Sequence, residues 1–315
     1  MAGSVISKYW GVYLNDFMRL MGWNANTNLT FGSFHIDIAP IIIVAFFTTL
    51  LVFGTKIGAR VDGAMTVLKI AIVFFVVIVG FFYVKASNFT PFIPPSQPAS
   101  TVEGSSAVTG VMTQPLWQFA TGMTPSVYGV PGILSGAALV FFAFIGFDVV
   151  ATASEETKNP HKNVPLGIGV GMLLIIVMYM LVAVVTTGMV SYADLAKQDS
   201  PSLATAFELV GADWAAKIIS FGIVLGLATV VMVLLLGLTR IVFAMSRDGL
   251  LPRGLSKTGK HGTPAVLQIV VGAVVALVAA FFDIGVLSDM VNIGTLSAFT
   301  LVAISIPIMR KKRPD

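Results

Sequence analysis

The sequence predicts an all-α polytopic membrane protein with about eight transmembrane helices. Of the 315 residues, 56% are hydrophobic and only 11% are charged, whereas a soluble domain carries about 25% charged residues. The mean hydropathy is +0.91. Apolar runs of the length that crosses a bilayer, about 20 residues, recur along the whole chain. Together these observations exclude a soluble globular protein.

Seven apolar runs are long enough to span a membrane and are nearly free of charge. They cover residues 36–53, 63–84, 132–151, 164–190, 214–244, 264–282 and 287–309. An eighth run, residues 3–21, is less apolar because it contains Lys8, Asp16 and Arg19. We expect these runs to form one transmembrane domain over residues 1–315.

The distribution of Lys and Arg predicts how the spans are oriented, because basic connections resist translocation. Connections with several basic residues alternate with connections that have one or none. The basic ones contain Lys56 and Arg60, Lys158 and Lys162, Arg247 to Lys260, and the tail 310–313. Eight crossings put all of these on one side, so we expect a multi-pass protein of the cell (plasma) membrane with both termini cytoplasmic.

The other residue types exclude several classes of protein. Basic residues outnumber acidic ones by 19 to 15, but they form no patch, so no nucleic-acid partner is expected. Cysteine is absent, which excludes disulfides and Cys-ligated metals. His35, His161 and His261 lie in connections or at span edges, so neither an intramembrane enzyme nor a metal site is expected. A channel would need pore rings or a filter loop, and neither is evident. No cofactor is predicted.

Two connections have patterns of their own. Residues 85–131 are rich in Ser, Thr, Pro and Gly, which predicts an irregular extracellular loop; a disordered linker explains residues 95–109 equally well. The segment Ser200-Pro201 precedes Leu203, Ala206, Phe207 and Val210, which predicts a short capped amphipathic helix on the outside. Such a helix is either a lid or an ordinary surface helix.

Ionisable residues inside the spans are candidate functional residues, because each costs at least a few kcal/mol there. Lys69 lies about two turns into its span, and Asp148 lies about a turn from the cytoplasmic end of another, so their depths are similar. As a pair they could couple protonation to helix packing. Alternatively, Lys69 snorkels to the interface and Asp148 caps a helix. Arg240 is better explained by snorkelling or packing.

A glycine and an acid interrupt the apolar segment Phe141 to Asp148, which also holds four phenylalanines. This pattern is compatible with a discontinuous helix, whose unwound backbone could bind the carboxylate and ammonium of a zwitterion. The alternative is plain: phenylalanine often faces lipid, and the spacings Gly132/Gly136 and Gly222/Gly226 are those of ordinary helix packing.

A series of motifs runs through residues 141–315. It comprises Phe141 to Asp148, Glu155 to Pro160, Val164 to Ile168, Arg240 with Met245 to Pro252, Gly262 to Pro264, Asn292 to Leu296, and Arg313 to Asp315. Each motif is weak alone. Their order and spacing together resemble the amino acid-polyamine-organocation superfamily of permeases, and within it the bacterial branch similar to cationic amino acid transporters.

The resemblance implies a partial LeuT-type inverted-repeat fold, in which the spans resemble helices 3 to 10 and Phe141 to Asp148 is the unwound part of helix six. It implies a substrate-binding segment around Gly146, in which backbone carbonyls meet the substrate ammonium and Phe142 also acts as an aromatic gate. The carbonyls are those of Phe142, Ala143, Phe144 and Ile145. Lys69 resembles the lysine that couples a proton to the site, with Asp148 as its partner.

The sequence departs from the family at both ends, because no residues correspond to helices one and two or to those that follow helix ten. We therefore expect a fragment of a secondary active, proton-coupled amino acid permease, with an amino acid as substrate and the lipid bilayer as its environment. The alternative is a non-transporting truncated membrane protein with a regulatory or interaction role.

Overall fold

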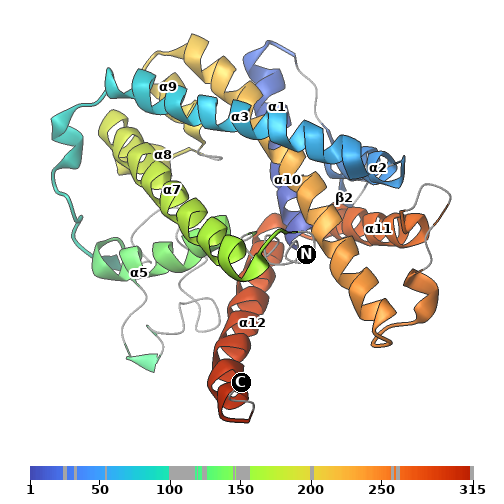
Figure 1. Ribbon diagram of the computed structural model, residues 1–315. Coiled ribbons are helices and arrows are strands. Elements are labelled where there is room, and N and C mark those ends of the chain that lie inside the picture. Colours follow the sequence, from blue (N-terminus) through green and yellow to red (C-terminus); the bar gives the residue numbers. More distant parts are fainter. Residues whose placement is uncertain are drawn as a thin grey trace. The chain divides into compact units, whose positions relative to one another are not determined.

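A computed structural model of the chain is mainly α-helical (Figure 1). It describes residues 1–23, 27–31, 34–53, 55–98, 118, 120–122, 126–144, 146, 157–198, 202–256, 259 and 263–312. The chain forms two compact units. The larger comprises Met1–Val84 with Gly146–Asp315, and the smaller comprises Lys85–Ile145.

Each predicted span overlaps an α-helix, while its crossing of a membrane stays a prediction. The larger unit contains α1 (Ala2–Leu20), α2 (Ile38–Phe53), α3 (Thr55–Phe81), α7 (Pro160–Met189), α8 (Tyr192–Ala196), α9 (Leu203–Leu209), α10 (Asp213–Arg247), η6 (Arg253–Ser256), α11 (Ala265–Phe281), α12 (Ile284–Lys312) and the strands β1 (Asn28–Phe31) and β2 (Phe34–Asp37). The smaller unit contains η1 (Ala86–Phe89), β3 (Gln97–Pro98), β4 (Ser126–Val127), α5 (Gly129–Val140) and η4 (Phe141–Phe144).

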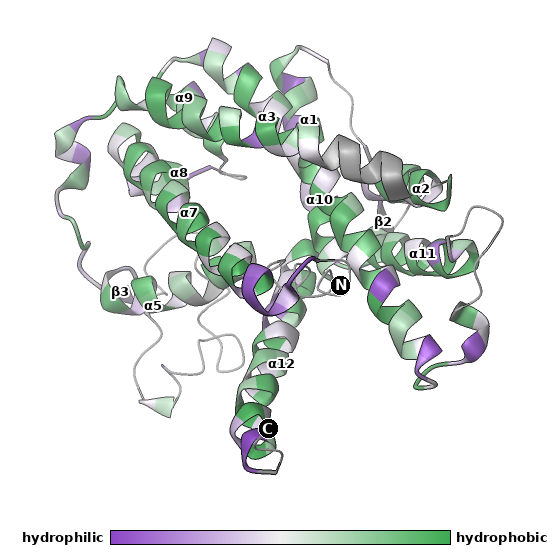
Figure 2. Ribbon diagram, in the orientation of Figure 1, coloured by the Kyte–Doolittle hydropathy of each residue, from purple (hydrophilic) through white to green (hydrophobic). Residues whose placement is uncertain are grey.

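The described helices have the lengths and surfaces of membrane helices. Four are long and apolar enough to cross a bilayer: Gly63–Phe81, Pro160–Met189, Asp213–Arg247 and Ile284–Lys311; α2 and α11 are apolar but shorter. Figure 2 shows α7 hydrophobic along its length beyond a polar first turn. Its exposed side chains include Leu173, Ile176 and Met180. Exposed apolar surface on this scale fits contact with lipid and not with water, so the chain is a multi-pass membrane protein.

One hydrophobic core lies among α1, α2, α10 and α11. Its buried members include Trp10, Phe47, Leu235 and Leu267. Polar side chains join the same helices through backbone carbonyls. The Ser4 hydroxyl donates to the Val275 carbonyl at 3.0 Å, and the Thr263 hydroxyl donates to the Val52 carbonyl at 2.9 Å. Each of these hydroxyls thus keeps a hydrogen-bond acceptor although it lies in an apolar interior.

A second core joins α3, α7, α9 and α10, and its buried side chains include Val76, Val185, Phe207 and Ile219. The short helix predicted after Ser200 is present as α9, although Ser200 and Pro201 lie outside the described residues. The Ser202 hydroxyl caps it by accepting from the Thr205 amide at 3.1 Å. Phe207 is only 1% exposed. α9 is therefore anchored in this core by its inner face, and its role as a lid stays a prediction.

A β-hairpin separates α1 from α2 and corrects the predicted start of the second span. Strands β1 and β2 pair antiparallel, with Leu29 opposite Ile36 and Asn28 opposite Asp37. The apolar run begins at Ile36, but α2 begins only at Ile38 because the two preceding residues belong to β2. The predicted irregular loop 85–131 also contains regular structure, since β3 pairs with β4 and α5 begins at Gly129.

Gly80 allows α3 to approach the second core closely, which gives a stability prediction. A Cβ at this position would clash with Val185 Cγ1 and lie 2.8 Å from Met189 Sδ. We expect Gly80→Ala to lower the free energy of unfolding by about 1–3 kcal/mol, the usual cost of overpacking. Gly171→Ala on α7 is the matched control, because a Cβ there meets nothing within 4 Å. Thermal unfolding in detergent measures both, and equal midpoints would contradict the prediction.

Candidate functional site

Of the segment Phe141 to Asp148, the structure describes residues 141–144 and 146, where the α-helix stops; its continuation as a discontinuous helix stays a prediction. The α-helix α5 ends at Val140 and continues as the 3₁₀ helix η4 over Phe141–Phe144. Gly146 follows with a φ of +123°, a backbone conformation that favours glycine. A 3₁₀ segment bonds from residue i to i+3, so the backbone over Phe141–Phe144 departs from the hydrogen-bond pattern of α5.

The predicted substrate-binding residues are placed in part. Ala143 is exposed, and Phe144 and Gly146 are half-buried. The backbone of Phe142 belongs to η4, but its side chain lies outside the described residues, as do Ile145 and Asp148. The aromatic gate and the pairing of Lys69 with Asp148 therefore stay predictions.

Lys69 lies on α3, in the larger unit, where it is half-buried. Its aliphatic stem lies against α10 at Gly226. A Cβ at position 226 would be 3.6 Å from Lys69 Cγ and 3.8 Å from Lys69 Cε. Because Gly226 has no side chain, the surface of α10 is flat there, and the Lys69 stem lies against it.

The face of α3 that contains Lys69 packs along α10, and the two helices run antiparallel. Ile72, three residues after Lys69, meets Gly222, four residues before Gly226. Further on, Phe75 and Trp214 make an edge-to-face contact with ring centroids 5.8 Å apart. The glycine spacing in α10 that suggested helix packing does serve packing, and the partner surface on α3 includes Lys69.

α1 holds α10 at the same level. Trp10 is buried, and its indole N–H donates to the Val224 carbonyl at 3.0 Å. The Thr229 hydroxyl donates to the Gly226 carbonyl at 3.0 Å. Sequence reasoning missed this contact, because a tryptophan in an apolar run does not reveal which helix it will reach.

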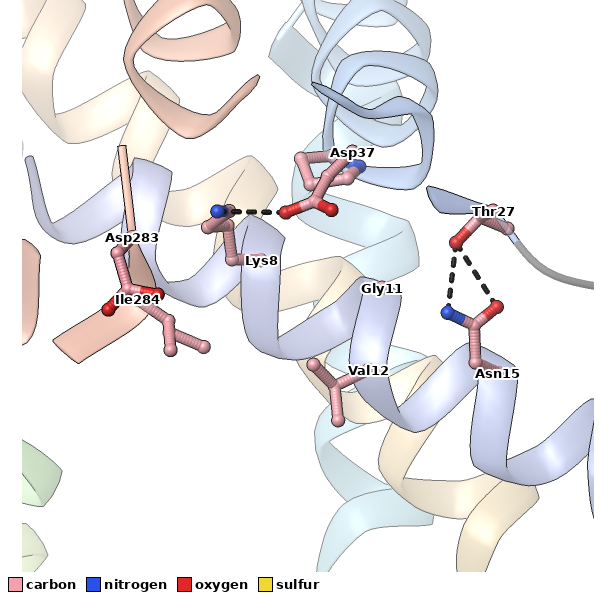
Figure 3. Close-up of a pocket in the computed structure, with 9 residues that line it drawn as sticks. Lys8, Gly11, Val12, Asn15, Thr27, Asp37, Asp283 and Ile284 are labelled. Carbon is pink, nitrogen blue, oxygen red and sulfur yellow. Dashed lines mark hydrogen bonds and ion pairs between the residues drawn. The ribbon is translucent and has the colours of Figure 1, made fainter. Parts of the chain in front are cut away.

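A cavity of about 150 Å³ lies beside α1, at the start of α2 and of α12 (Figure 3). Its polar lining comprises Lys8, Asn15, Thr27, Asp37 and Asp283. The Lys8 ammonium lies 2.8 Å from Asp37 Oδ2 and also donates to the Phe282 carbonyl. Asn15 and Thr27 hydrogen-bond to each other at 3.0 and 3.1 Å.

Lys8 joins the ends of two helices by electrostatics. The Phe282 carbonyl stands at the C-terminus of α11, where a cation is favourable, and Asp37 precedes the first residue of α2, where an anion is favourable. Nearby, Asp283 Oδ1 accepts from the Gly285 amide at 2.8 Å and so begins α12. Lys8 marked its run as less apolar, but the sequence showed no partner for it, because the hairpin that brings Asp37 there was not predicted.

The comparisons with known proteins agree on one family. The family model described as amino acid permease matches residues 4–315. The chain is similar to the branched-chain amino acid permease BcaP of Bacillus subtilis, at 38% identity over 100% of this chain and 62% of the relative. It is also similar to the methylthioribose transporter of the same organism, at 38% identity over 87% of this chain and 52% of the relative.

A plant relative extends the comparison. Cationic amino acid transporter 4, vacuolar, of Arabidopsis thaliana is 34% identical over 89% of this chain and 42% of the relative. The chain thus spans between about two fifths and three fifths of the length of these relatives. These relatives are named as a permease and as transporters. The chain belongs to the amino acid permease family of the amino acid-polyamine-organocation superfamily.

Proposed function

We propose that the chain forms the substrate-binding and coupling core of a secondary active, proton-coupled amino acid permease of the plasma membrane, with its termini cytoplasmic. The observation that carries the proposal is the break at η4 and Gly146. An irregular backbone in an apolar segment is tolerated where it lines a cavity or is buried in protein, and transporters use such breaks to bind the charged groups of a substrate.

The proposed substrate contacts use the backbone of the break. Carbonyls of Phe142, Ala143, Phe144 and Ile145 accept hydrogen bonds from the substrate ammonium. The Phe142 ring covers the apolar side chain of the substrate. Backbone carbonyls suit an ammonium because they accept hydrogen bonds and carry the negative ends of peptide dipoles. This arrangement is proposed for the α-amino group common to all amino acids.

The proposed coupling residues are Lys69 and Asp148. A lysine whose stem rests on an apolar helix face is costly to keep charged, so its charge must be balanced by a partner or lost with its proton. We propose that Asp148 balances it in one state of the transport cycle and that proton loss accompanies the other. The half-buried position of Lys69 against Gly226 supports this role.

Uptake into proteoliposomes tests the proposed function. Labelled leucine, alanine and lysine, with methylthioribose for comparison, are offered with and without an inward proton gradient. Because the relatives are longer than this chain, the assay uses the chain by itself and a chimera that adds the B. subtilis BcaP residues outside the matched part. We expect gradient-dependent uptake of at least one amino acid by the chimera or by both. Uptake by neither would favour the non-transporting role, provided that BcaP itself is active in the same vesicles.

A further inference from the structure

Gly226 supports Lys69, whereas the neighbouring glycine of α10 supports a different side chain. At Gly222, a Cβ would clash with Ile72 Cδ1, so the substitution must displace the Ile72 side chain and not that of Lys69. At Gly226, a Cβ would lie 3.6 and 3.8 Å from two atoms of the Lys69 stem, which is ordinary van der Waals contact. One methyl group therefore fits at position 226, whereas a valine adds two carbons about 1.5 Å beyond the Cβ, and we expect these to crowd the Lys69 stem.

α10 is restrained from moving away from a larger residue at position 226. The Trp10 indole of α1 holds the Val224 carbonyl at 3.0 Å, and Val224, Val231 and Leu235 are buried in the core shared with α1, α2 and α11. Toward the N-terminus of α10 from position 226, the contact between Phe75 and Trp214 fixes α3 on α10. Interiors packed in this way have little spare volume. Atoms added at position 226 must therefore displace the more flexible group, which is the Lys69 side chain.

We infer that Gly226 is a positioning residue, which sets where the Lys69 ammonium lies by giving its stem a flat surface on α10. Cε is the atom bonded to the ammonium nitrogen, and it is one of the two stem atoms nearest to Gly226. A side chain added at position 226 would therefore contact an atom that is one bond away from the charged nitrogen. The functional consequence rests on the proposed coupling role of Lys69, while the contact itself does not.

The first test is the pH dependence of amino acid uptake in proteoliposomes, measured on whichever form transports. Gly226→Ala is expected to keep the midpoint of the pH profile, because its methyl fits. Gly226→Val is expected to move the midpoint by at least half a unit, and half a unit corresponds to about 0.7 kcal/mol of altered interaction with the ammonium. Gly222→Ala is the matched control: it is expected to lower the amount of folded protein without moving the midpoint.

The second test does not depend on transport. The chain has no cysteine, so Lys69→Cys introduces a single thiol whose sulfur stands near the position of Lys69 Cγ. We expect its rate of reaction with N-ethylmaleimide to change when Gly226→Val is added, and to stay the same with Gly226→Ala. An unchanged rate with Gly226→Val would overturn the inference.

The two tests distinguish the failure of the inference from that of the proposed function. If Lys69→Ala leaves the pH profile intact, the coupling role fails, but the thiol rates still decide whether Gly226 positions residue 69. If Gly222→Ala moves the pH midpoint as much as Gly226→Val does, general separation of α3 and α10 is the cause and the inference is wrong. Conversely, a midpoint moved only by Gly226→Val, with a changed thiol rate, supports it.

Discussion

Lys69→Ala is expected to reduce gradient-driven amino acid uptake at least tenfold, in the chain or in the chimera with BcaP. Removing the ammonium removes the group proposed to carry the coupled proton, and a tenfold loss corresponds to about 1.4 kcal/mol of transition-state stabilisation. The substitution also opens the α3 surface that rests on Gly226, but deletion of a lysine stem from a half-buried position leaves the apolar contacts of Ile72 and Phe75 in place.

Lys85→Ala is the matched control for Lys69→Ala. Lys85 is an exposed lysine just after the same helix, so its loss changes the net charge equally without touching the proposed coupling site. Thermal midpoints of all proteins show whether lost uptake reflects lost folding. Retained proton dependence in a folded Lys69→Ala protein would show that another group carries the proton.

Among the ion pairs of the described residues, the pair of Lys8 and Asp37 is the least exposed, and Lys8→Met is expected to lower stability markedly. The Lys8 side chain is only 11% exposed and its partner Asp37 is 25% exposed, so removing the ammonium leaves a carboxylate in a poorly solvated place. Breaking a buried ion pair costs about 3–5 kcal/mol, and the partial exposure of Asp37 lowers our expectation to about 2 kcal/mol. The Phe282 carbonyl at the end of α11 also loses a donor.

A second substitution separates charge from packing at the Lys8 position. Adding Asp37→Asn to Lys8→Met is expected to recover part of the loss, because the uncompensated carboxylate is gone. Lys197→Ala is the control: its ion pair with Asp194 at 3.1 Å is 72% and 57% exposed and should contribute no measurable stability. This holds although the Ser191 hydroxyl and Lys197 lower the pKa of Asp194. Thermal unfolding in detergent is the measurement, and equal midpoints for Lys8→Met and Lys197→Ala would contradict the prediction.

The sequence predicted the helices better than their contacts. Apolar runs located them because the bilayer demands long hydrophobic stretches, and Gly146 marked the break because only glycine takes its backbone angle readily. The hairpin before α2 was not predicted, because its pairing of Ile36 with Leu29 depends on residues that read equally well as the start of a span. Without that hairpin, the Lys8–Asp37 pair could not be foreseen.

The same holds for the candidate site: its residues could be predicted from the sequence, but their contacts could not. Lys69 was identified from its cost inside a span, and the spacing of Gly222 and Gly226 indicated a packing face. That the two features meet was not predictable, since helix periodicity gives the face of each helix but not the partner it packs against. The break at η4 could be located from one segment alone, because its glycine and acid, Gly146 and Asp148, are only two residues apart in sequence.

The most direct test of the central proposal is the pH inside proteoliposomes when an amino acid is added outside. A trapped fluorescent pH indicator follows the lumen while potassium and valinomycin clamp the membrane potential, with the transporting form of the protein in the vesicles. A proton-coupled permease is expected to acidify the lumen on addition of its substrate, and Lys69→Ala is expected to abolish the acidification. Uptake of labelled amino acid without any change of lumenal pH would contradict proton coupling, and the absence of both would contradict transport.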